Sequence, residues 1–300
     1  FDMILIKKYI LLTKVDGYEQ NGYFCDMDYV RKLFDFYLNA SVHVALSVYC
    51  FVRITEKYFD LPYNEALDYF IFYGTITGYN FVKYFGIAKF HHRSLTNDLK
   101  VIQLFSFFCF LLMCYYAFQL PLPTLLWYLP FGALTILYAI PFLSGFQKNL
   151  RNVSYMKIVV VAFVWAGVSV VIPIMDAKQA IENPVVWYMF LQRFVLVAVL
   201  ILPFDIRDVQ FDAISLQTIP KKIGEKNTKK LGFALLLFAV LLEFLIAPDL
   251  RFRSIFLLVF LAMLFFLMRA TVQQSKYYSS FWVELLPILW CLVLFGFTGV

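Results

Sequence analysis

Long apolar runs alternate with short polar stretches along most of the chain. Nine of these runs approach the length of about 20 residues that a helix needs to cross the hydrocarbon core of a membrane. Prolines lie mostly at their edges, where they begin or end helices instead of interrupting them. The pattern predicts nine transmembrane helices, at residues 33–54, 64–85, 101–119, 122–142, 157–174, 185–204, 231–247, 253–270 and 281–299.

The composition supports a membrane protein. The chain is 62% hydrophobic and 15% charged, and a soluble domain of 300 residues cannot bury that much apolar surface. The five cysteines are scattered without a CxxC pair, so they suggest neither a disulfide framework nor a zinc site. We predict an all-α membrane domain over residues 33–300, with residues 1–32 as a cytoplasmic or interfacial lead-in.

The basic residues indicate how the chain is oriented. With the N-terminus in the cytoplasm, 20 of the 26 lysines and arginines lie on the cytoplasmic side and five lie outside, a strong positive-inside signal. An odd number of spans places the C-terminus on the opposite side. Membrane orientation accounts for the net charge of +6, so no nucleic-acid partner is expected. The long connections at 86–100 and 205–230 are cytoplasmic, and we expect any polar site to open there.

Three aspartates follow the sixth predicted span, in the stretch "FDIRDVQFDAISLQTIPKKIG". Asp205, Asp208 and Asp212 are spaced three and four apart, which places them along one face of a helix. Carboxylates this close repel unless a cation holds them, and Mg²⁺ prefers oxygen ligands that it shares with substrate phosphates. Lys221 and Lys222 suit an anionic ligand near such a metal. The start of a solvated loop is also rich in Asp, so the spacing alone leaves both interpretations open.

The same stretch resembles the second aspartate-rich motif of the UbiA superfamily of intramembrane prenyltransferases. That motif is DxxDxxxD followed by Thr-x-Pro and Gly, and its further counterparts here are Thr218, Pro220 and Gly224. The stretch "LYAIPFLSGFQKNLR" is similar, more loosely, to a Tyr-x-x-Pro and basic segment of the superfamily, through Tyr138, Pro141, Lys148 and Arg151. The predicted helix count, the orientation and the place of the motif after the sixth span agree with this resemblance.

The resemblance implies a helix bundle around a central cavity, with two aspartate motifs at its cytoplasmic mouth. These would bind Mg²⁺ with the diphosphate of an isoprenyl donor, whose chain passes to a lipophilic acceptor. On this basis Asp205, Asp208 and Asp212 are the catalytic and metal-binding candidates. The candidates for binding the diphosphate are Asn80, Lys83, Lys89, Arg93, Lys148, Arg151, Lys221 and Lys222. We expect an integral protein of the bacterial inner (cytoplasmic) membrane, surrounded by lipid.

The first aspartate motif of the superfamily, NDxxDxxxD, is incomplete here. In "GYNFVKYFGIAKFHHRS" Asn80 matches, but Phe81, Tyr84 and Ala88 stand at the aspartate positions. One hypothesis is an active enzyme in which a single Mg²⁺ suffices and nearby basic residues neutralise the phosphate directly. The other is a catalytically inactive UbiA-fold subunit that binds lipid or scaffolds a membrane protein complex. A cation-coupled transporter fits less well, because no broken apolar helix carries paired carboxylates at the membrane midplane.

Two further polar residues lie within predicted spans. Arg193 is well inside the sixth span, where an unpaired charge costs about 2.5–3.5 kcal/mol on insertion scales. We expect an ion pair with Glu243 of the seventh span, either structural or in contact with an acceptor head group. His43, in the first span, is interpreted as a hydrogen-bonded packing residue.

Overall fold

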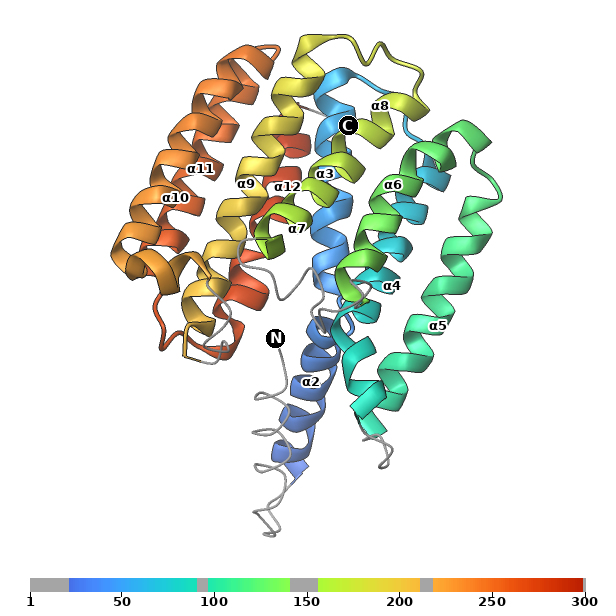
Figure 1. Ribbon diagram of the computed structural model, residues 1–300, viewed down its shortest axis with the longest axis vertical. Coiled ribbons are helices and arrows are strands. Elements are labelled where there is room, and N and C mark those ends of the chain that lie inside the picture. Colours follow the sequence, from blue (N-terminus) through green and yellow to red (C-terminus); the bar gives the residue numbers. More distant parts are fainter. Residues whose placement is uncertain (1–21, 91–96, 141–155, 211–217, 299–300) are drawn as a thin grey trace, which may run out of the picture.

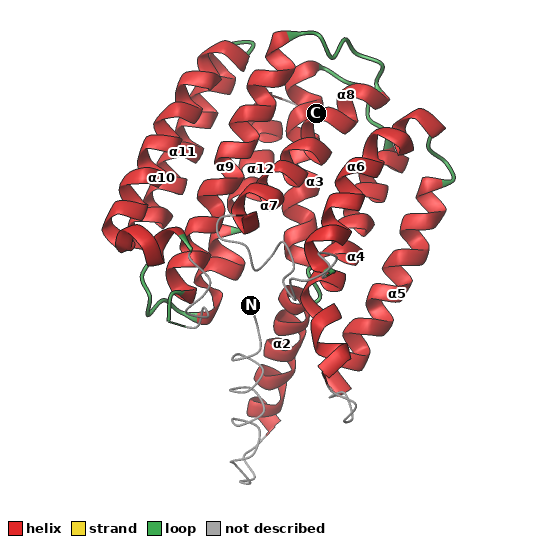
Figure 2. Ribbon diagram, viewed as in Figure 1, coloured by secondary structure: helices red, strands yellow, loops and turns green. Residues whose placement is uncertain are grey.

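The structure is a computed structural model that describes residues 22–90, 97–140, 156–210 and 218–298, without the side chains of residues 22–28, 85–90 and 97. Within these ranges it is helical and contains no strand (Figure 2). The elements are α2 (Gly22–Asn39), α3 (Val42–Phe59), α4 (Glu65–Phe90), α5 (Asn97–Ala117), α6 (Leu122–Ala139), α7 (Met156–Ala166), the π-helical turn η2 (Gly167–Val171), α8 (Ile172–Asp176), α9 (Pro184–Asp208), α10 (Ile219–Ile246), α11 (Leu250–Arg269), the π-helical turn η3 (Tyr278–Val283) and α12 (Leu286–Thr298).

The helices form a bundle in which α3, α9 and α12 lie centrally (Figure 1). Helices α10 and α11 pack on one side, and α4, α5 and α6 lie on the other, while α2 projects from one end. Helix α9 is apolar on nearly all sides and most of it is buried, as expected for a helix inside a bundle. Helix α5 instead exposes a row of large apolar side chains, Leu104, Phe107, Phe108, Leu111 and Tyr115, which suits contact with lipid.

Each of the nine predicted spans falls on a helix or on joined helices in the part of the chain that the structure describes. Six helical stretches there are long and apolar enough to cross a membrane, and α2 with α3 makes a seventh if the bent pair counts as one span. Helices α4 and α10 are not among these. Tyrosines, threonines and Asn80 dilute the apolar character of α4, and the first half of α10 is rich in lysine.

The first predicted span is not one continuous helix, contrary to the sequence pattern. The axis bends by 54° between the stretches Tyr29–Asn39 and Val42–Phe59, and Ser41 has a φ of 61° and a ψ of 21°. A left-handed conformation is costly for a residue other than glycine unless its surroundings hold it. The bonds that hold it come from α4 and are described with the candidate site.

The fifth predicted span is a composite of α7, η2 and α8. Gly167 begins the π-helical turn and packs directly against the ring of Phe131 on α6. A Cβ added at Gly167 would overlap that ring. Here glycine allows two helices to approach closely, which is a common use of small residues in membrane bundles.

We predict that Gly167→Ala destabilises the protein by about 1–3 kcal/mol, the usual cost of forcing extra atoms into a packed core. The measurement is thermal unfolding of the detergent-solubilised protein. Gly296→Ala is the matched control, because an added Cβ there has no heavy atom within 4 Å. Equal unfolding temperatures for the two variants would show that the contact between α6 and η2 is not tight.

Candidate functional site

Asp205 and Asp208 occupy the last turn of α9, and both are buried although they carry charge, with 1% and 5% of their surfaces exposed. Their spacing of three residues puts them on one side of the helix. Lys157, in the first turn of α7, places its Nζ 2.6 Å from Asp205 Oδ1. The Arg207 Nε donates to Asp208 Oδ1 at 2.9 Å. Each carboxylate therefore already holds a cation supplied by the protein.

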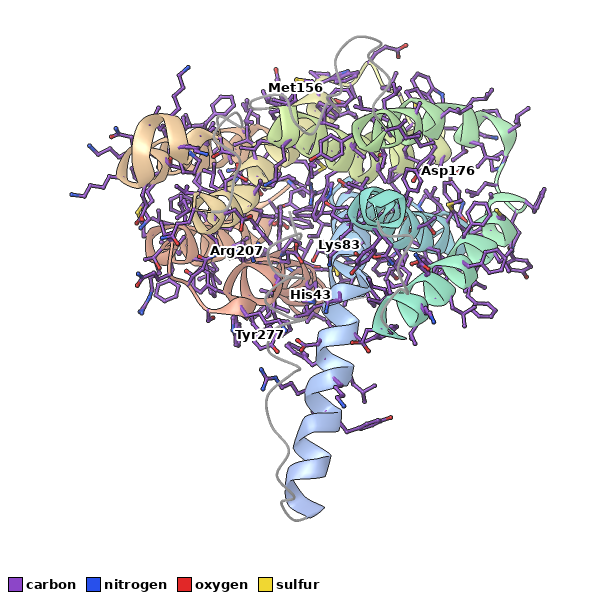
Figure 3. All side chains as sticks on the ribbon, turned by 60° about the horizontal axis from the view of Figure 1, so that its bottom comes forward. His43, Lys83, Met156, Asp176, Arg207 and Tyr277 are labelled. Carbon is purple, nitrogen blue, oxygen red and sulfur yellow. The ribbon has the colours of Figure 1, made fainter. Side chains whose placement is uncertain are left out.

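A third carboxylate, that of Glu284, is half-buried between η3 and α12. It interacts electrostatically with Lys83 of α4 and with Arg207 of α9. Figure 3 shows Lys83 and Arg207 toward the middle of the bundle in that view. Sequence reasoning did not single out Glu284. The available signal was that it is the sole charged residue in the predicted span 281–299.

Asn80 braces the break between α2 and α3. Its Oδ1 accepts from Ser41 Oγ at 2.8 Å, and its Nδ2 donates to the carbonyl of Ala40 at 3.0 Å and to Ser106 Oγ at 2.8 Å. A buried side-chain amide that makes three hydrogen bonds is strongly held in one orientation. Asn80, which the sequence motif marks as a candidate phosphate ligand, therefore has a structural role in this conformation.

Lys83 and Tyr84 support the same break. The Lys83 ammonium and the Tyr84 hydroxyl both donate to the carbonyl of Asn39, at 3.2 and 2.9 Å. That carbonyl ends α2, where the helix leaves its last acceptors without backbone partners. The end of α4 that resembles the first aspartate motif therefore holds the bent entry into α3.

A groove with a volume of about 270 Å³ lies beside this brace, between α4 and α5. It is lined by Thr77, Asn80, Phe81, Tyr84, Gln103, Ser106 and Phe107. Phe81 and Tyr84 stand at two of the aspartate positions of the first motif. An aromatic lining supplies no carboxylate oxygen, so this wall of the bundle cannot hold Mg²⁺ as the second motif could.

The second motif has clear structural reasons for its Pro and its Gly. Thr218 precedes α10 in an extended conformation, and Pro220 lies in the first turn, where a missing backbone N–H costs nothing. Gly224 has a φ of 79°, and the helix is kinked there, a conformation that glycine adopts without steric penalty. Lys221 and Lys222 lie in this first turn, half-buried and exposed respectively.

The expected ion pair between Arg193 and Glu243 does not form. The two oxygens of Glu243 accept instead from Tyr58 Oη at 2.8 Å and from Gln192 Nε2 at 2.7 Å. The buried guanidinium of Arg193 lies 4.0 Å from the centre of the Phe51 ring, and its nitrogens have no hydrogen-bond partner among the described residues. The orientation of the helices gives Glu243 two nearer donors. Arg193 is therefore stabilised by aromatic faces and by the charge of Glu243, which lies farther away.

His43 is the hydrogen-bonded packing residue that the sequence predicts. Its Nε2 donates to the carbonyl of Phe281 at 3.0 Å, and its Nδ1 accepts from the Tyr37 hydroxyl at 2.7 Å. Its ring also stacks on that of Phe281. These contacts tie α3 to α2 and to η3.

Mg²⁺ is the metal that the second motif implies, and the described side chains can be tested against it. Within the described ranges no three His, Cys, Asp or Glu side chains form a group that could hold a metal ion. Asp205 and Asp208 supply two hard oxygen ligands, and Asp212 lies outside the described residues. Two carboxylates fit an ion that takes its remaining ligands from water and substrate phosphates, which is the usual manner for Mg²⁺ in phosphate sites.

No protein-family model matches the sequence, and no curated protein matches it significantly. Solved structures do match its fold. An apo UbiA homologue from Aeropyrum pernix K1 superimposes with a TM-score of 0.62 at 15% identity, over 85% of this chain and 98% of the other. The chain has the UbiA fold. The resemblance indicated by its second aspartate motif is thereby confirmed at the level of fold.

Two further structures with the UbiA fold match over similar lengths. A UbiA homologue from Archaeoglobus fulgidus bound to GPP and Mg²⁺ gives a TM-score of 0.58 at 13% identity, over 88% of this chain and 99% of the other. A digeranylgeranylglyceryl phosphate synthase gives 0.53 at 15% identity, over 89% and 97%. These matches cover almost the whole of each compared structure, so the UbiA fold accounts for the bundle as a unit.

Several candidate residues of the UbiA motifs lie beyond what the structure describes. Lys89 is on α4, but its side chain is outside the description. The others are wholly outside it: Arg93, Lys148, Arg151 and Asp212. Of the candidates that are described, the structure brings Asp205 and Asp208 together with Lys157 and Arg207, two cations that the sequence did not single out as ligands.

We predict that Asn80→Ala lowers stability by about 2 kcal/mol or more, because it leaves Ser41 and the carbonyl of Ala40 without their buried partner. The measurement is thermal unfolding without any added ligand. Gln103→Ala is the control, since Gln103 lines the same groove but is exposed. An unchanged unfolding temperature for Asn80→Ala would show that the amide does not hold the break.

Proposed function

We propose that this chain is a prenyltransferase of the UbiA fold, which moves an isoprenyl chain from a prenyl diphosphate to a lipophilic acceptor with Mg²⁺. The observation that carries the proposal is the burial of Asp205 and Asp208 side by side at the end of α9, beside Lys157 and Arg207. The A. fulgidus homologue was solved with GPP and Mg²⁺, which supports a diphosphate as the ligand of this fold.

Asp205 and Asp208 are the described residues that would hold the ion, joined by Asp212. The bound ion would offset the charge that grows on the departing diphosphate. Lys157 and Arg207 would turn from the carboxylates to the phosphate oxygens, since lysine and arginine both bind phosphate. Because each carboxylate is paired with a cation of the protein, the ion and the diphosphate must enter together to replace both pairs.

The remaining candidate ligands of the diphosphate approach from other parts of the sequence. We assign Lys83 of α4 to this role, with Lys221 and Lys222 at the start of α10. Lys89, Arg93, Lys148 and Arg151 are further candidates from the segments that the resemblance marks. Cations are favourable around a diphosphate because they neutralise charge in a water-poor site. Asn80 would support these side chains indirectly, because it holds the bend between α2 and α3 beside Lys83.

The membrane topology completes the proposal. All nine helical segments cross the membrane around a central cavity, with the N-terminus in the cytoplasm and the C-terminus on the opposite side. The supporting observation is the concentration of basic residues in the connections on one side. The last turn of α9 and the first turn of α7 then lie at the cytoplasmic mouth of the bundle, where a water-soluble head group can enter while its chain stays in the apolar interior.

A second candidate function is a catalytically inactive subunit that binds lipid or scaffolds a membrane complex. The observation that favours it is the aromatic lining of the groove by Phe81 and Tyr84, where the first motif would carry aspartates. In that case the ion pairs of Asp205 and Asp208 are structural, and their cations never exchange partners.

We predict that Asp208→Asn abolishes prenyl transfer, because an amide is a far poorer ligand for Mg²⁺ than a carboxylate. Prenyl diphosphate should raise the unfolding temperature of the native protein only when Mg²⁺ is present, by the stabilisation that any ligand of the folded state gives. Mg²⁺ alone should give no shift, because Lys157 and Arg207 occupy both carboxylates. The measurements are transfer of radiolabelled prenyl diphosphates to a lipid extract, and thermal unfolding in detergent.

Asp249→Asn is the matched control for Asp208→Asn. Asp249 caps α11 by accepting from the backbone of Arg251 and Phe252, and asparagine caps helices equally well. The inactive-subunit hypothesis predicts no transfer by the native protein and no Mg²⁺-dependent shift. A shift that occurs without Mg²⁺ would contradict the metal-bridged arrangement and leave a site made of lysines and arginines.

A further inference from the structure

The groove between α4 and α5 opens toward the lipid side of the bundle. Helix α5 lies at the edge of the bundle beside α4 (Figure 1), and two of the residues that it contributes to the groove, Gln103 and Phe107, are exposed. The neighbouring side chains of Leu104 and Phe108 are also more than half exposed, at 58% and 54%. A largely aromatic hollow that borders the hydrocarbon of a bilayer is filled by a lipid chain in preference to water, because water needs several polar partners to remain there.

The polar groups of the groove wall are hydrogen-bonded within the described structure, with one exception. The hydroxyls of Thr77 and Ser106 each donate to a backbone carbonyl one turn earlier, at 2.9 and 2.7 Å. The side chains of Asn80 and Tyr84 hold the bend between α2 and α3. The amide of Gln103 makes no hydrogen bond to any described residue. Its two N–H donors and its acceptor oxygen are therefore left at a lipid-facing position, where an unsatisfied polar group is costly.

A basic side chain lies on the same side of α5, one turn closer to its N-terminus. Lys100 is exposed and precedes Gln103 by three residues, which makes the two side chains neighbours on the helix surface. Asp98 is exposed as well, but its spacing of five residues from Gln103 turns it to another side of the helix. In the proposed topology this end of α5 is cytoplasmic, where anionic lipids attract basic residues close to the membrane surface.

The groups along this side of α5 follow the order of the parts of a phospholipid. Lys100 lies near the start of the apolar stretch Asp98–Ala117. Gln103 lies about 4.5 Å farther along the helix axis and Phe107 about 6 Å beyond that, at the rise of 1.5 Å per residue. Lysine binds phosphate as a point charge, an amide can donate to an ester oxygen, and an aromatic ring packs against an acyl chain. Phosphate, ester and chain follow one another in the same order in the lipid.

We infer that the groove between α4 and α5 binds one anionic phospholipid of the surrounding membrane. Its phosphate lies at Lys100, its ester oxygens accept from Gln103, and one chain lies along Phe81 and Phe107. The bound lipid also covers Asn80 and so stabilises the bend between α2 and α3. This site shares no residue with the carboxylates and cations at the ends of α7 and α9. It does not depend on whether the bundle catalyses prenyl transfer.

The test is the affinity of the delipidated, full-length protein in detergent for phosphatidylglycerol and for phosphatidylcholine, measured by native mass spectrometry, which counts the lipids bound. The native protein should bind one phosphatidylglycerol more tightly than phosphatidylcholine. Lys100→Gln should weaken binding of phosphatidylglycerol about fivefold, the effect of one basic residue at an anionic surface, and leave phosphatidylcholine unchanged. Lys230→Gln is the matched control, because Lys230 is also exposed beside a predicted span but lies on α10.

Gln103→Leu tests the second contact. It should weaken binding of both lipids, because both carry the ester oxygens, while Gln119→Leu, an exposed glutamine just beyond the other end of α5, should change neither. Folding is preserved in all four variants, since each changes an exposed side chain.

Three results would overturn the inference. Unchanged affinity in both Lys100→Gln and Gln103→Leu would remove the site, and an equal loss in Lys230→Gln would show that only the overall charge matters. Equal binding of the two lipids by the native protein would exclude an anionic head group as the determinant. Inorganic phosphate should not displace the lipid. Displacement would show a site for free phosphate and would also contradict a lipid-binding groove.

Discussion

A charged side chain inside a membrane bundle is stable only where an opposite charge or an aromatic face lies beside it. This constraint fixes the helices of the present structure relative to one another. Lys157 ties the start of α7 to Asp205 at the end of α9, and Lys276 ties the segment before η3 to Asp35 of α2. Arg193, in the centre of the bundle, is stabilised by an aromatic face: its guanidinium lies over a ring of α3. The apolar contacts fill the bundle, while these charges determine which helix ends meet.

The same constraint shapes how a ligand could bind. In the described part of the candidate site the two cations beside the aspartates already have carboxylate partners: Lys157 with Asp205, and Arg207 with Asp208. A ligand therefore cannot simply add to an open positive pocket. It must exchange partners with groups of the protein, and every buried charge that it leaves unpaired is costly. Entry of a divalent cation together with a polyanion satisfies both signs at once, which is why a metal–diphosphate pair suits this site better than either ion alone.

Much of the fold could be predicted from the sequence, because the hydropathy of a segment alone shows whether it avoids water. The prediction does not require knowledge of which helices lie beside it. Asp205 and Asp208 were found for a similar reason, since their relation is local to one helix turn. The break at Ser41 was missed because it depends on Asn80, 39 residues away. The pairing of Arg193 with Glu243 was wrong because Tyr58 and Gln192 compete for the same carboxylate, and the orientations of three helices, α3, α9 and α10, decide that competition.

The absence of aspartates from the end of α4 and the charge of Lys83 there form one physical problem. Phe81 and Tyr84 occupy two aspartate positions, and Lys83 lies between them. The C-terminal part of α4 therefore carries positive charge where the superfamily motif would carry negative charge. That lysine ammonium bonds the end of α2 but still needs an anion within the low-dielectric interior. A ligand that brings negative charge to this end of α4 is therefore favoured there.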